Sequence, residues 1–414
     1  MYKMAVNLVL FCLALFIVNV YSDILCETGF CERHIRQNPC AEPAPDCDLN
    51  NGTHSGIWLP SPTLCNCCKF CLPMYNKGAV CSIGGPGTGI TVGRCGEGLT
   101  CDNTTRVCVR MKTKCHDAQD DYDAREARSQ TGFTEVRPEC DDKGKFLSYV
   151  CVPSQTCFCQ SEDGERIFGE VANTGSVSMP CRCSRMFHKI QKTISNSVPY
   201  PVVTLRCTSD GNFNPVQCFD RKCHCVDKIT GIKTGTEVID LDEKAITDLP
   251  CYEADLDLFR PRNVSQRPFQ YTTPCYESVN ERRQLIDQSK KDGYNVDYFS
   301  SFTSINCLPD GTFGRTLINS NGTKVCINER NARIGNFEAR INTPEYDDMD
   351  CKCAITSSLM SSSELPRCCS NGNFRPIQCR RGSCYCVDSD GRQEGMQTAD
   401  ISSLPCYTAN WRNC

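Results

Sequence analysis

The sequence predicts a tandem array of small disulfide-rich modules, with little helix and with short β-sheets and loops. Cysteine makes up 37 of the 414 residues, a density typical of disulfide scaffolds. A pattern of Gln-Cys, a short loop, Cys-x-Cys-Val and two glycines occurs at 217–235 and again at 378–395. A pattern that recurs within one chain marks a duplicated module. Modules of this size need covalent bridges because their apolar cores are small.

Residues 1–22 are expected to be a signal peptide that is removed before Asp23. Lys3 supplies a positive charge, and 5–20 is an almost continuous apolar run with small residues near its end. An uncleaved membrane anchor is the alternative. Cleavage is favoured, because the run is short for a membrane-spanning helix and lacks a basic flank.

Removal of the signal peptide would take Cys12 with it and reduce the cysteines from 37 to 36, an even number. All of them could then pair in an oxidising compartment, so we expect a secreted, extracellular protein. Four Asn-x-Ser/Thr sequons fit this location as predicted glycosylation sites: Asn51, Asn103, Asn263 and Asn321.

The first predicted domain is 23–108, which contains twelve cysteines. Its centre is Cys65-Asn66-Cys67-Cys68-Lys69-Phe70-Cys71, and it ends with a Cys-Gly-Glu-Gly-Leu-Thr-Cys segment at 95–101. This cysteine order resembles the N-terminal domain of insulin-like growth-factor-binding proteins. The resemblance implies the pairs Cys81–Cys101 and Cys95–Cys108, and it leaves the pairing from Cys26 to Cys71 open.

Two departures argue against hormone binding by this domain. Asn66 replaces a glycine of the family, and only 102–107 separate the last two cysteines. Hormone binding needs a desolvated apolar patch, and Val107 is the single apolar residue in this segment. A zinc site at Cys65, Cys67, Cys68 and Cys71 is the alternative to disulfides. Disulfides are favoured behind a signal peptide and beside eight more cysteines.

Four further modules follow a short polar link. They are module one at 115–181, module two at 183–251, a degenerate module three at 275–351, and module four with a C-terminal tail at 353–414. Each has two cysteines far apart, then Gly-x-Phe, then a form of the recurring cysteine motif. This order resembles the thyroglobulin type-1 module, and module two retains the Gly-Thr pair of that family at 235–236.

The resemblance implies that the six cysteines of a module pair in order, first with second, third with fourth and fifth with sixth. The implied pairs are Cys115–Cys140, Cys151–Cys157 and Cys159–Cys181 in module one; Cys183–Cys207, Cys218–Cys223 and Cys225–Cys251 in module two; and Cys353–Cys368, Cys379–Cys384 and Cys386–Cys406 in module four.

Module three lacks the third and fourth cysteines, which pair with each other in the family. We therefore expect Cys275–Cys307 and Cys326–Cys351, with the loop at 315–324 in place of the missing bridge. Module four has one extra cysteine, Cys369, and the terminal Cys414 is the other unassigned one. We predict the pair Cys369–Cys414 in a monomer. An intermolecular bridge that makes a dimer is the alternative.

Single residues, Arg182 and Lys352, separate the modules of each pair, which indicates two semi-rigid pairs. Residues 252–274 contain prolines and charges but no cysteine, and we expect a linker there. Met186, Phe187, Ile190 and Ile194 recur at helical spacing and predict a short helix that covers the sheet of module two.

The chain is predicted not to be an enzyme and to need no cofactor or metal. Five histidines are spread over different modules, and no catalytic or phosphate-binding motif is present. Phe158, His224 and Tyr385 occupy the tryptophan position of the thyroglobulin type-1 motif. We interpret them as packing residues, with a ligand role for His224 as the second reading. A net charge of −4 favours no nucleic-acid partner, and we expect no membrane association after signal removal.

Three functions remain open from the sequence. Some thyroglobulin type-1 modules inhibit papain-like cysteine proteases by inserting a wedge of loops, so the resemblance implies a protease inhibitor with cysteine proteases as partners. The alternatives are binding of insulin-like or other growth factors, and an extracellular-matrix protein with multivalent contacts. The candidate inhibitory residues are Tyr200, Pro201, Val202, Phe219, Asp220, Arg221 and Lys222 in module two, and Arg380 and Arg381 in module four. The turns at 227–233 and 389–392 complete these candidate edges.

Overall fold

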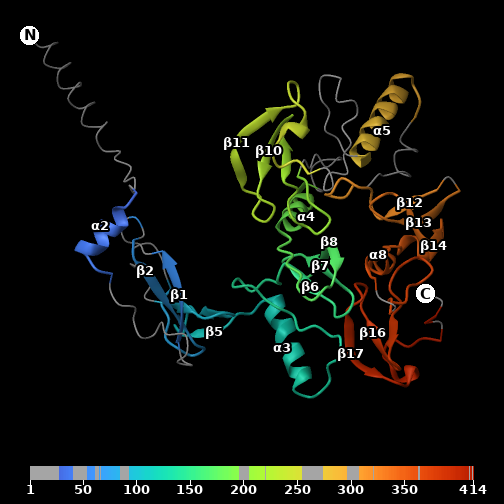
Figure 1. The fold of residues 1–414 in the computed structure, drawn as a ribbon. Coiled ribbons are helices and arrows are strands. Elements are labelled where there is room, and N and C mark those ends of the chain that lie inside the picture. The colour runs from blue at the N-terminus through green and yellow to red at the C-terminus, as the bar shows by residue number, and fades with distance from the viewer. Residues whose placement is uncertain are drawn as a thin grey trace, which may run out of the picture. The chain divides into compact units, whose positions relative to one another are not determined.

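The computed structural model describes residues 28–40, 54–60, 65, 67–83, 93–194, 205–219, 221–253, 274–295, 307–319, 321–361, 364–409, 411–412 and 414. The chain divides into an N-terminal unit, Met1–Met111, and a C-terminal unit, Lys112–Cys414 (Figure 1). The predicted signal peptide, Cys26, Asn51 and Asn263 lie outside the described residues, as does most of the predicted linker.

The described part of the N-terminal unit contains one short helix and five strands. They are α2 (Phe30–Gln37), β1 (His54–Pro60), β2 (Lys69–Tyr75), β3 (Arg94–Cys95), β4 (Leu99–Cys101) and β5 (Cys108–Arg110). β1 pairs with β2 in antiparallel register along its whole length, and β3 adds to β2 in parallel. The disulfides between described residues of this unit include Cys31–Cys67, Cys40–Cys68, Cys81–Cys101 and Cys95–Cys108. The last two are the pairs that the resemblance implies.

The C-terminal unit repeats one plan four times, a helix followed by a three-stranded antiparallel sheet with its second strand in the middle. Module one has α3 (Lys114–Glu126), β6 (Tyr149–Cys151), β7 (Thr156–Gln160) and β8 (Arg166–Ala172), and module two has α4 (Arg182–Ile194), β9 (Val216–Phe219), β10 (Lys222–Val226) and β11 (Lys233–Asp240). Module three has α5 (Pro274–Lys291), β12 (Thr316–Ile318), β13 (Thr323–Ile327), β14 (Arg333–Arg340) and α7 (Pro344–Asp347), and module four has α8 (Lys352–Leu359), β15 (Ile377–Arg380), β16 (Ser383–Val387) and β17 (Gln393–Thr398). Short 3-10 turns, η3 (Ile246–Asp248) and η4 (Ile401–Ser403), follow the sheets of modules two and four.

Disulfides hold each sheet at fixed points. In modules one, two and four a bridge closes the first hairpin, with Cα separations of 3.9 Å for Cys151–Cys157, 4.1 Å for Cys218–Cys223 and 4.0 Å for Cys379–Cys384. A second bridge joins each middle strand to the end of its module, as Cys225–Cys251 does in module two. Every module pair that the resemblance implies is present in the structure, and Cys369 is joined to Cys414.

The helix of module two lies where the spacing predicts it. Phe187 is buried and Ile190 packs beside it against Phe213 and Val226, so α4 covers its sheet as expected. Met186 was included in the same apolar stripe, but its side chain is 48% exposed. The core contact of α4 therefore depends on Phe187, while Met186 lies at its margin.

Glycine is required where consecutive modules of a pair meet. Gly211 has a φ of 84° and Gly372 a φ of 82°, both in the left-handed region that favours glycine. A Cβ atom at Gly211 would lie 2.5 Å from Cys159 Sγ, and one at Gly372 would overlap Cys326 Sγ. The Gly-x-Phe turn of the second module is thus packed on the last disulfide of the first module, in both pairs.

Polar contacts complete each join. The guanidinium of Arg185 in α4 donates to the carbonyl oxygens of Phe146 at 2.6 Å, Leu147 at 2.8 Å and Gln160 at 2.9 Å in module one. Burial of this side chain lowers the pKa of Arg185. In the second pair, Asn373 Oδ1 accepts from Asp350 N at 2.8 Å. Both joins are therefore packed rather than flexible.

Modules one and four are also in contact, although they lie at opposite ends of the C-terminal unit's sequence. Thr134 Oγ1 donates to Gln393 Oε1 at 2.6 Å, and Thr356 Oγ1 donates to Glu170 Oε1 at 2.7 Å. Arg166 Nη1 donates to the carbonyl oxygen of Asp390 at 3.3 Å. The sequence suggests two pairs that move on a linker. The structure instead joins the pairs through a polar interface, which has no local sequence signal.

In module three a lysine occupies one of the two positions where the other modules carry the cysteines of the hairpin bridge. Lys324 lies opposite Ile318 in the β12–β13 ladder, where the other modules carry two cysteines. Lys324 Nζ donates to the carbonyl oxygens of Tyr346 at 3.0 Å and Met349 at 3.3 Å, and it lies 5.1 Å from the centre of the Tyr346 ring. Burial lowers the pKa of Lys324. The lysine therefore ties the middle strand to the segment around α7.

The linker prediction is wrong at its C-terminal end. Pro274 was assigned to the linker, but it is the first residue of α5. Proline is favoured at the start of a helix, because the missing N–H would have no partner there and its φ is already helical. The rest of 254–273 lies outside the described residues.

Gly211→Ala is expected to destabilise the C-terminal unit more than Gly235→Ala. Both glycines have positive φ, but a Cβ atom at Gly235 has nothing within 4 Å. The left-handed strain of about 1 kcal/mol is common to both variants, and overpacking against the Cys159 bridge adds about 1–3 kcal/mol to Gly211→Ala alone. Denaturant unfolding under non-reducing conditions measures the difference, and equal losses would contradict the packed join.

Lys324→Met is expected to lower the free energy of unfolding by about 1 kcal/mol or more, because two half-buried carbonyl oxygens lose their donor. Methionine retains most of the apolar stem, so the loss reports the ammonium contacts. The exposed Lys244 provides the control, and Lys244→Met should change stability by less than about 0.5 kcal/mol. Thermal unfolding of the two variants compares these losses. Equal melting temperatures would show that the contacts of Lys324 do not stabilise the fold.

Candidate functional site

The hairpin between the first and second strands gives each module an exposed tip. In module two this tip is Phe219–Lys222, where Phe219 and Lys222 are paired across the strands directly beside the Cys218–Cys223 bridge. The Phe219 side chain is 74% exposed. Arg221 has a φ of 65°, and its Nη2 lies 2.6 Å from Asp242 Oδ1. The tip is thus a short, fixed loop that presents an aromatic ring and a cation; Asp220 lies outside the described residues.

The corresponding tip of module four is cationic and has no exposed aromatic residue. Arg381 and Gly382 both have positive φ, 49° and 83°, as a two-residue type I′ turn requires. Arg380 and Arg381 both form ion pairs with Glu364, and the Arg381 side chain remains 81% exposed. This tip therefore offers charge without an apolar anchor.

The tips of modules one and three are less suited to bind a partner. In module one Val152 is buried and Ser154 has a φ of 59°, so the tip presents polar groups. In module three the tip has no disulfide, and the described part consists of Asn319 and Asn321–Thr323. Among the described tips, that of module two alone has an exposed aromatic residue.

A second candidate loop of module two lies at the other end of its sheet. The turn 227–232 is open to solvent, with Ile232 69% exposed. Hydrogen bonds from Thr230 and Ile229 to Asp227 hold the turn and keep the pKa of Asp227 below its ordinary value. Successive hairpins turn at opposite ends of their shared strand, here β10, so roughly 13 Å or more separates this turn from the tip. The two loops therefore do not form one continuous edge.

The equivalent turn of module four is covered by module one. Asp390 is buried, its carbonyl oxygen accepts from Arg166, and Lys352 Nζ lies 2.7 Å from its Oδ1. The Arg392 guanidinium lies 6.0 Å from the centre of the Phe158 ring. The expectation that 389–392 forms an inhibitory edge is wrong for this chain, because the contact between modules one and four occupies that turn.

Phe158 and Tyr385 are packing residues in the structure. Phe158 is 1% exposed, and the guanidinium groups of Arg166 and Arg392 lie 4.3 Å and 6.0 Å from the centre of its ring, while burial raises the pKa of Tyr385. His224 is half-buried in β10, paired with Gln217 and Val238. The remaining candidates Tyr200, Pro201 and Val202 lie outside the described residues.

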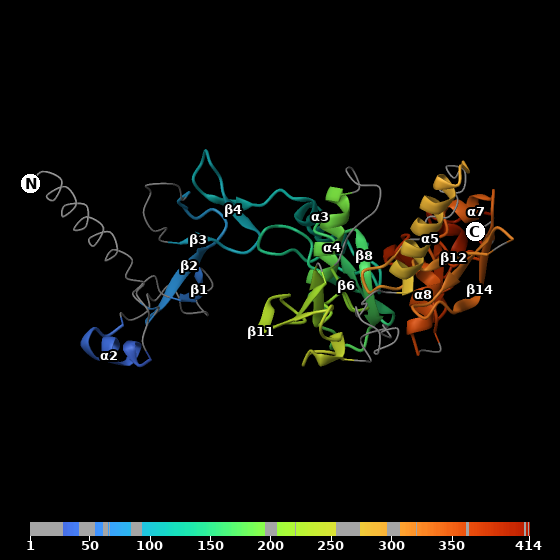
Figure 2. The same cartoon turned by 90° about the horizontal axis from the view of Figure 1, so that it is seen from above.

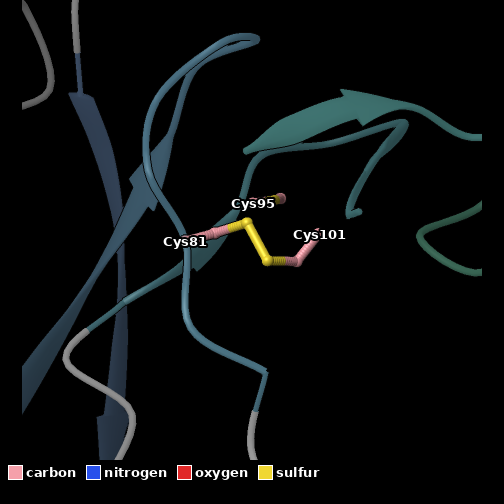
Figure 3. Close-up of side chains that lie close together, drawn as sticks. All are labelled: Cys81, Cys95 and Cys101. Atoms are coloured by element: carbon pink, nitrogen blue, oxygen red, sulfur yellow. A yellow bond between two sulfur atoms is a disulfide. The ribbon is translucent and has the colours of Figure 1, made fainter. Parts of the chain in front are cut away.

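Three cysteine sulfurs of the N-terminal unit lie within 4.8 Å of one another: those of Cys81, Cys95 and Cys101. Figure 3 shows that Cys81 and Cys101 are joined by a disulfide, and Cys95 is bonded to Cys108. The zinc alternative fails similarly at the central motif, because Cys65, Cys67 and Cys68 are all in disulfides. Oxidised sulfurs offer no thiolate to a metal ion.

Comparison with known families agrees with the repeated plan. The model of the thyroglobulin type-1 repeat matches residues 183–243 and 352–406, in modules two and four. Modules two and four are therefore similar to thyroglobulin type-1 repeats. A second family model, described as fungal protease inhibitor, matches residues 15–112. That match covers the twelve-cysteine region, and none of the similarities found concerns a growth-factor-binding protein.

Three relatives illustrate how far the similarity extends. Thyroglobulin of Rattus norvegicus is 29% identical over 116 residues, which is 27% of this chain and 4% of that protein. Thyroglobulin of Bos taurus is 31% identical over 91 residues, covering 22% of this chain and 3% of the relative. Equistatin of Actinia equina is 30% identical over 94 residues, covering 22% of this chain and 41% of equistatin. The chain thus spans less than half the length of each.

No helix in the described ranges is long and apolar enough to cross a membrane.

Limited trypsin digestion of the native chain should cut the open turn of module two before the covered turn of module four. Lys228 lies in the first turn and Lys233 directly follows it, and Arg392 ends the second turn. A protease needs an accessible segment that can open locally, and module one covers the bonds around Arg392. Mass spectrometry of early fragments identifies the order, and simultaneous cleavage at both turns would contradict the contact between modules one and four.

Proposed function

We propose that this protein is a secreted inhibitor of papain-like cysteine proteases and that it acts through the tip of module two, Phe219–Lys222. The thyroglobulin type-1 repeats support the class, because some modules of this type insert loops into the active-site cleft of such proteases. The observation that carries the assignment is the 74% exposure of Phe219 on a disulfide-closed tip.

The tip has the physical properties that tight docking requires. The Cys218–Cys223 bridge and the ion pair between Arg221 and Asp242 fix the loop before binding, so little conformational entropy is lost. An aromatic side chain that becomes desolvated at the centre of an interface supplies much of the binding energy. A fixed loop also resists cleavage, because a scissile peptide must adapt to the catalytic groups of the protease.

Module two is favoured over the other modules on two grounds. Its tip combines a bridge with an aromatic anchor, whereas the module four tip is cationic and module three has no bridge. Its sheet is also open at both ends, while module one covers the second turn of module four. One dominant inhibitory site per chain follows from this arrangement.

A second inhibitory activity in the N-terminal unit is supported by the match to the fungal protease inhibitor family. The β4–β5 hairpin of that unit is fixed at its base by two bridges, Cys81–Cys101 and Cys95–Cys108. Its loop at 102–107 is largely exposed. This hairpin is the candidate contact of the N-terminal unit with a protease, independent of module two.

Phe219→Ala is expected to raise the inhibition constant for a cathepsin-L-like enzyme by about 10- to 100-fold, the effect of losing one central aromatic anchor. Steady-state inhibition assays with the full chain provide the measurement. Thermal unfolding should be unchanged, since the ring is largely in solvent.

Ile232→Ala is the matched control, because it removes a similarly exposed apolar side chain from the other end of the same sheet. It should leave inhibition within about twofold of the unmodified protein. If Ile232→Ala weakened inhibition and Phe219→Ala did not, the protease contact would lie at the turn 227–232. A panel of papain-like enzymes without any inhibition would refute the function itself, and a parallel panel of fungal proteases tests the N-terminal unit.

A further inference from the structure

A groove lies beside the hairpin of module three that has no disulfide. Its walls are Asn319, Asn321, Gly322 and Thr323 of the hairpin, and Arg333, Glu338, Arg340 and Ile341 on or directly after β14. Its volume of about 490 Å³ is within the usual range for small-molecule sites. The groove therefore lies between β14 and the tip of a hairpin that no disulfide closes.

The walls have the chemistry of a carbohydrate site. Asparagine amides supply donors and acceptors, and Ile341 offers an apolar surface that is partly exposed. Arg333 is already paired with Glu338, with Nη2 2.7 Å from Oε2, and its Nε donates to the carbonyl oxygen of Gly335 at 3.1 Å. A carboxylate in the wall opposes an anionic ligand. A neutral molecule with many hydroxyl groups and one apolar face fits better.

Asn321 places an attachment point on the rim of this groove. It is exposed in the turn of the hairpin, and it begins the sequon Asn321-Gly322-Thr323. Its Oδ1 accepts from Thr323 N at 3.1 Å, which holds the side chain against the turn, and Gly322 has a φ of 77°. A sugar bonded to this amide starts at the groove and needs no flexible arm to reach it.

We propose that Asn321 carries an N-linked glycan whose first sugar, N-acetylglucosamine, occupies this groove and connects the β12–β13 hairpin to β14. The glycan contact then adds a connection to β14 in the one module whose first hairpin has no disulfide. This inference requires entry into a secretory pathway, but it does not depend on protease inhibition.

The modification is an ordinary group transfer. The amide nitrogen of Asn321 forms a bond to C1 of an oligosaccharide that is carried on a lipid diphosphate. The bond between C1 and the diphosphate oxygen breaks, the amide nitrogen loses one proton, and the lipid diphosphate leaves. No oxidant or reductant takes part.

Secretion of the full chain from eukaryotic cells provides the material for the test. Trypsin cuts after Arg315 and Lys324, so peptide 316–324 contains this sequon and no other. Mass spectrometry should find this peptide glycosylated. An unmodified Asn321 in the secreted protein overturns the proposal.

The role of the first sugar is tested on the folded protein with two enzymes. An endoglycosidase that leaves one N-acetylglucosamine should preserve the hydrogen-exchange protection of β12 and β13. A peptide N-glycosidase removes the whole glycan together with the amide nitrogen and leaves aspartate at position 321; it should speed exchange there by about three- to tenfold, the equivalent of one ordinary polar contact. Equal exchange rates after both treatments would overturn the groove contact. So would a complete loss of protection in β12 and β13 while the single sugar is still attached.

Arg340→Ala and the sequon at Asn103 supply the controls. Arg340→Ala should speed exchange of the hairpin in the glycosylated protein and have little effect after complete deglycosylation, because the side chain then faces an empty groove. Asn103 lies in an exposed turn of the N-terminal unit. Removing a glycan from Asn103 should leave the exchange of β12 and β13 unchanged. An Arg340→Ala effect of the same size in both forms would contradict the contact between the sugar and β14.

Discussion

Each pair of modules depends on the packing of one disulfide against one glycine turn. Cys159 is bonded to Cys181, and its sulfur meets the backbone at Gly211; Cys326 is bonded to Cys351 and meets Gly372 in the same way. The cores themselves are small, with a few buried side chains such as Val216, Ile239 and Leu249 in module two. Because a bridge that ends one module also supports the turn of the next, loss of either element would affect two modules at once.

The same rigidity decides where a partner can bind. A bridge holds the tip of module two in one conformation, and the aromatic ring of Phe219 is left in solvent at its edge. This combination of a fixed loop and an exposed aromatic side chain is the basis of the proposed protease contact. The module four tip keeps the bridge but carries arginines, and module one keeps the bridge but buries its valine. The four modules share one fold but present different side chains at the tips of their first hairpins.

The contact between modules one and four is a second reason why the modules differ in their exposed surfaces. It consists of side-chain amides, hydroxyl groups and charged groups, and Arg166 and Glu170 form a largely buried ion pair within it. Buried ions of this kind are tolerated when hydrogen bonds satisfy them. Here Thr356 and the carbonyl oxygen of Asp390 provide those bonds. The interface orients the two pairs and removes the turn at 389–392 from the surface, while the equivalent turn of module two stays open.

The sequence by itself predicted the covalent framework of the four modules, while the pairing from Cys26 to Cys71 stayed open. The order of cysteines identified the thyroglobulin type-1 plan, assigned the missing bridge of module three as a complete pair, and left Cys369 and Cys414 to each other. The spacing of Phe187 and Ile190 located α4, because helical periodicity is a local property. Only the tertiary structure decided which loops are open and what replaces the missing bridge. Thr134 and Gln393 are 259 positions apart, Glu170 and Thr356 are 186 apart, and Lys324 is fastened by backbone carbonyl oxygens that leave no trace in residue identity. Contacts between distant polar groups depend on how the modules pack, and no local pattern encodes that packing.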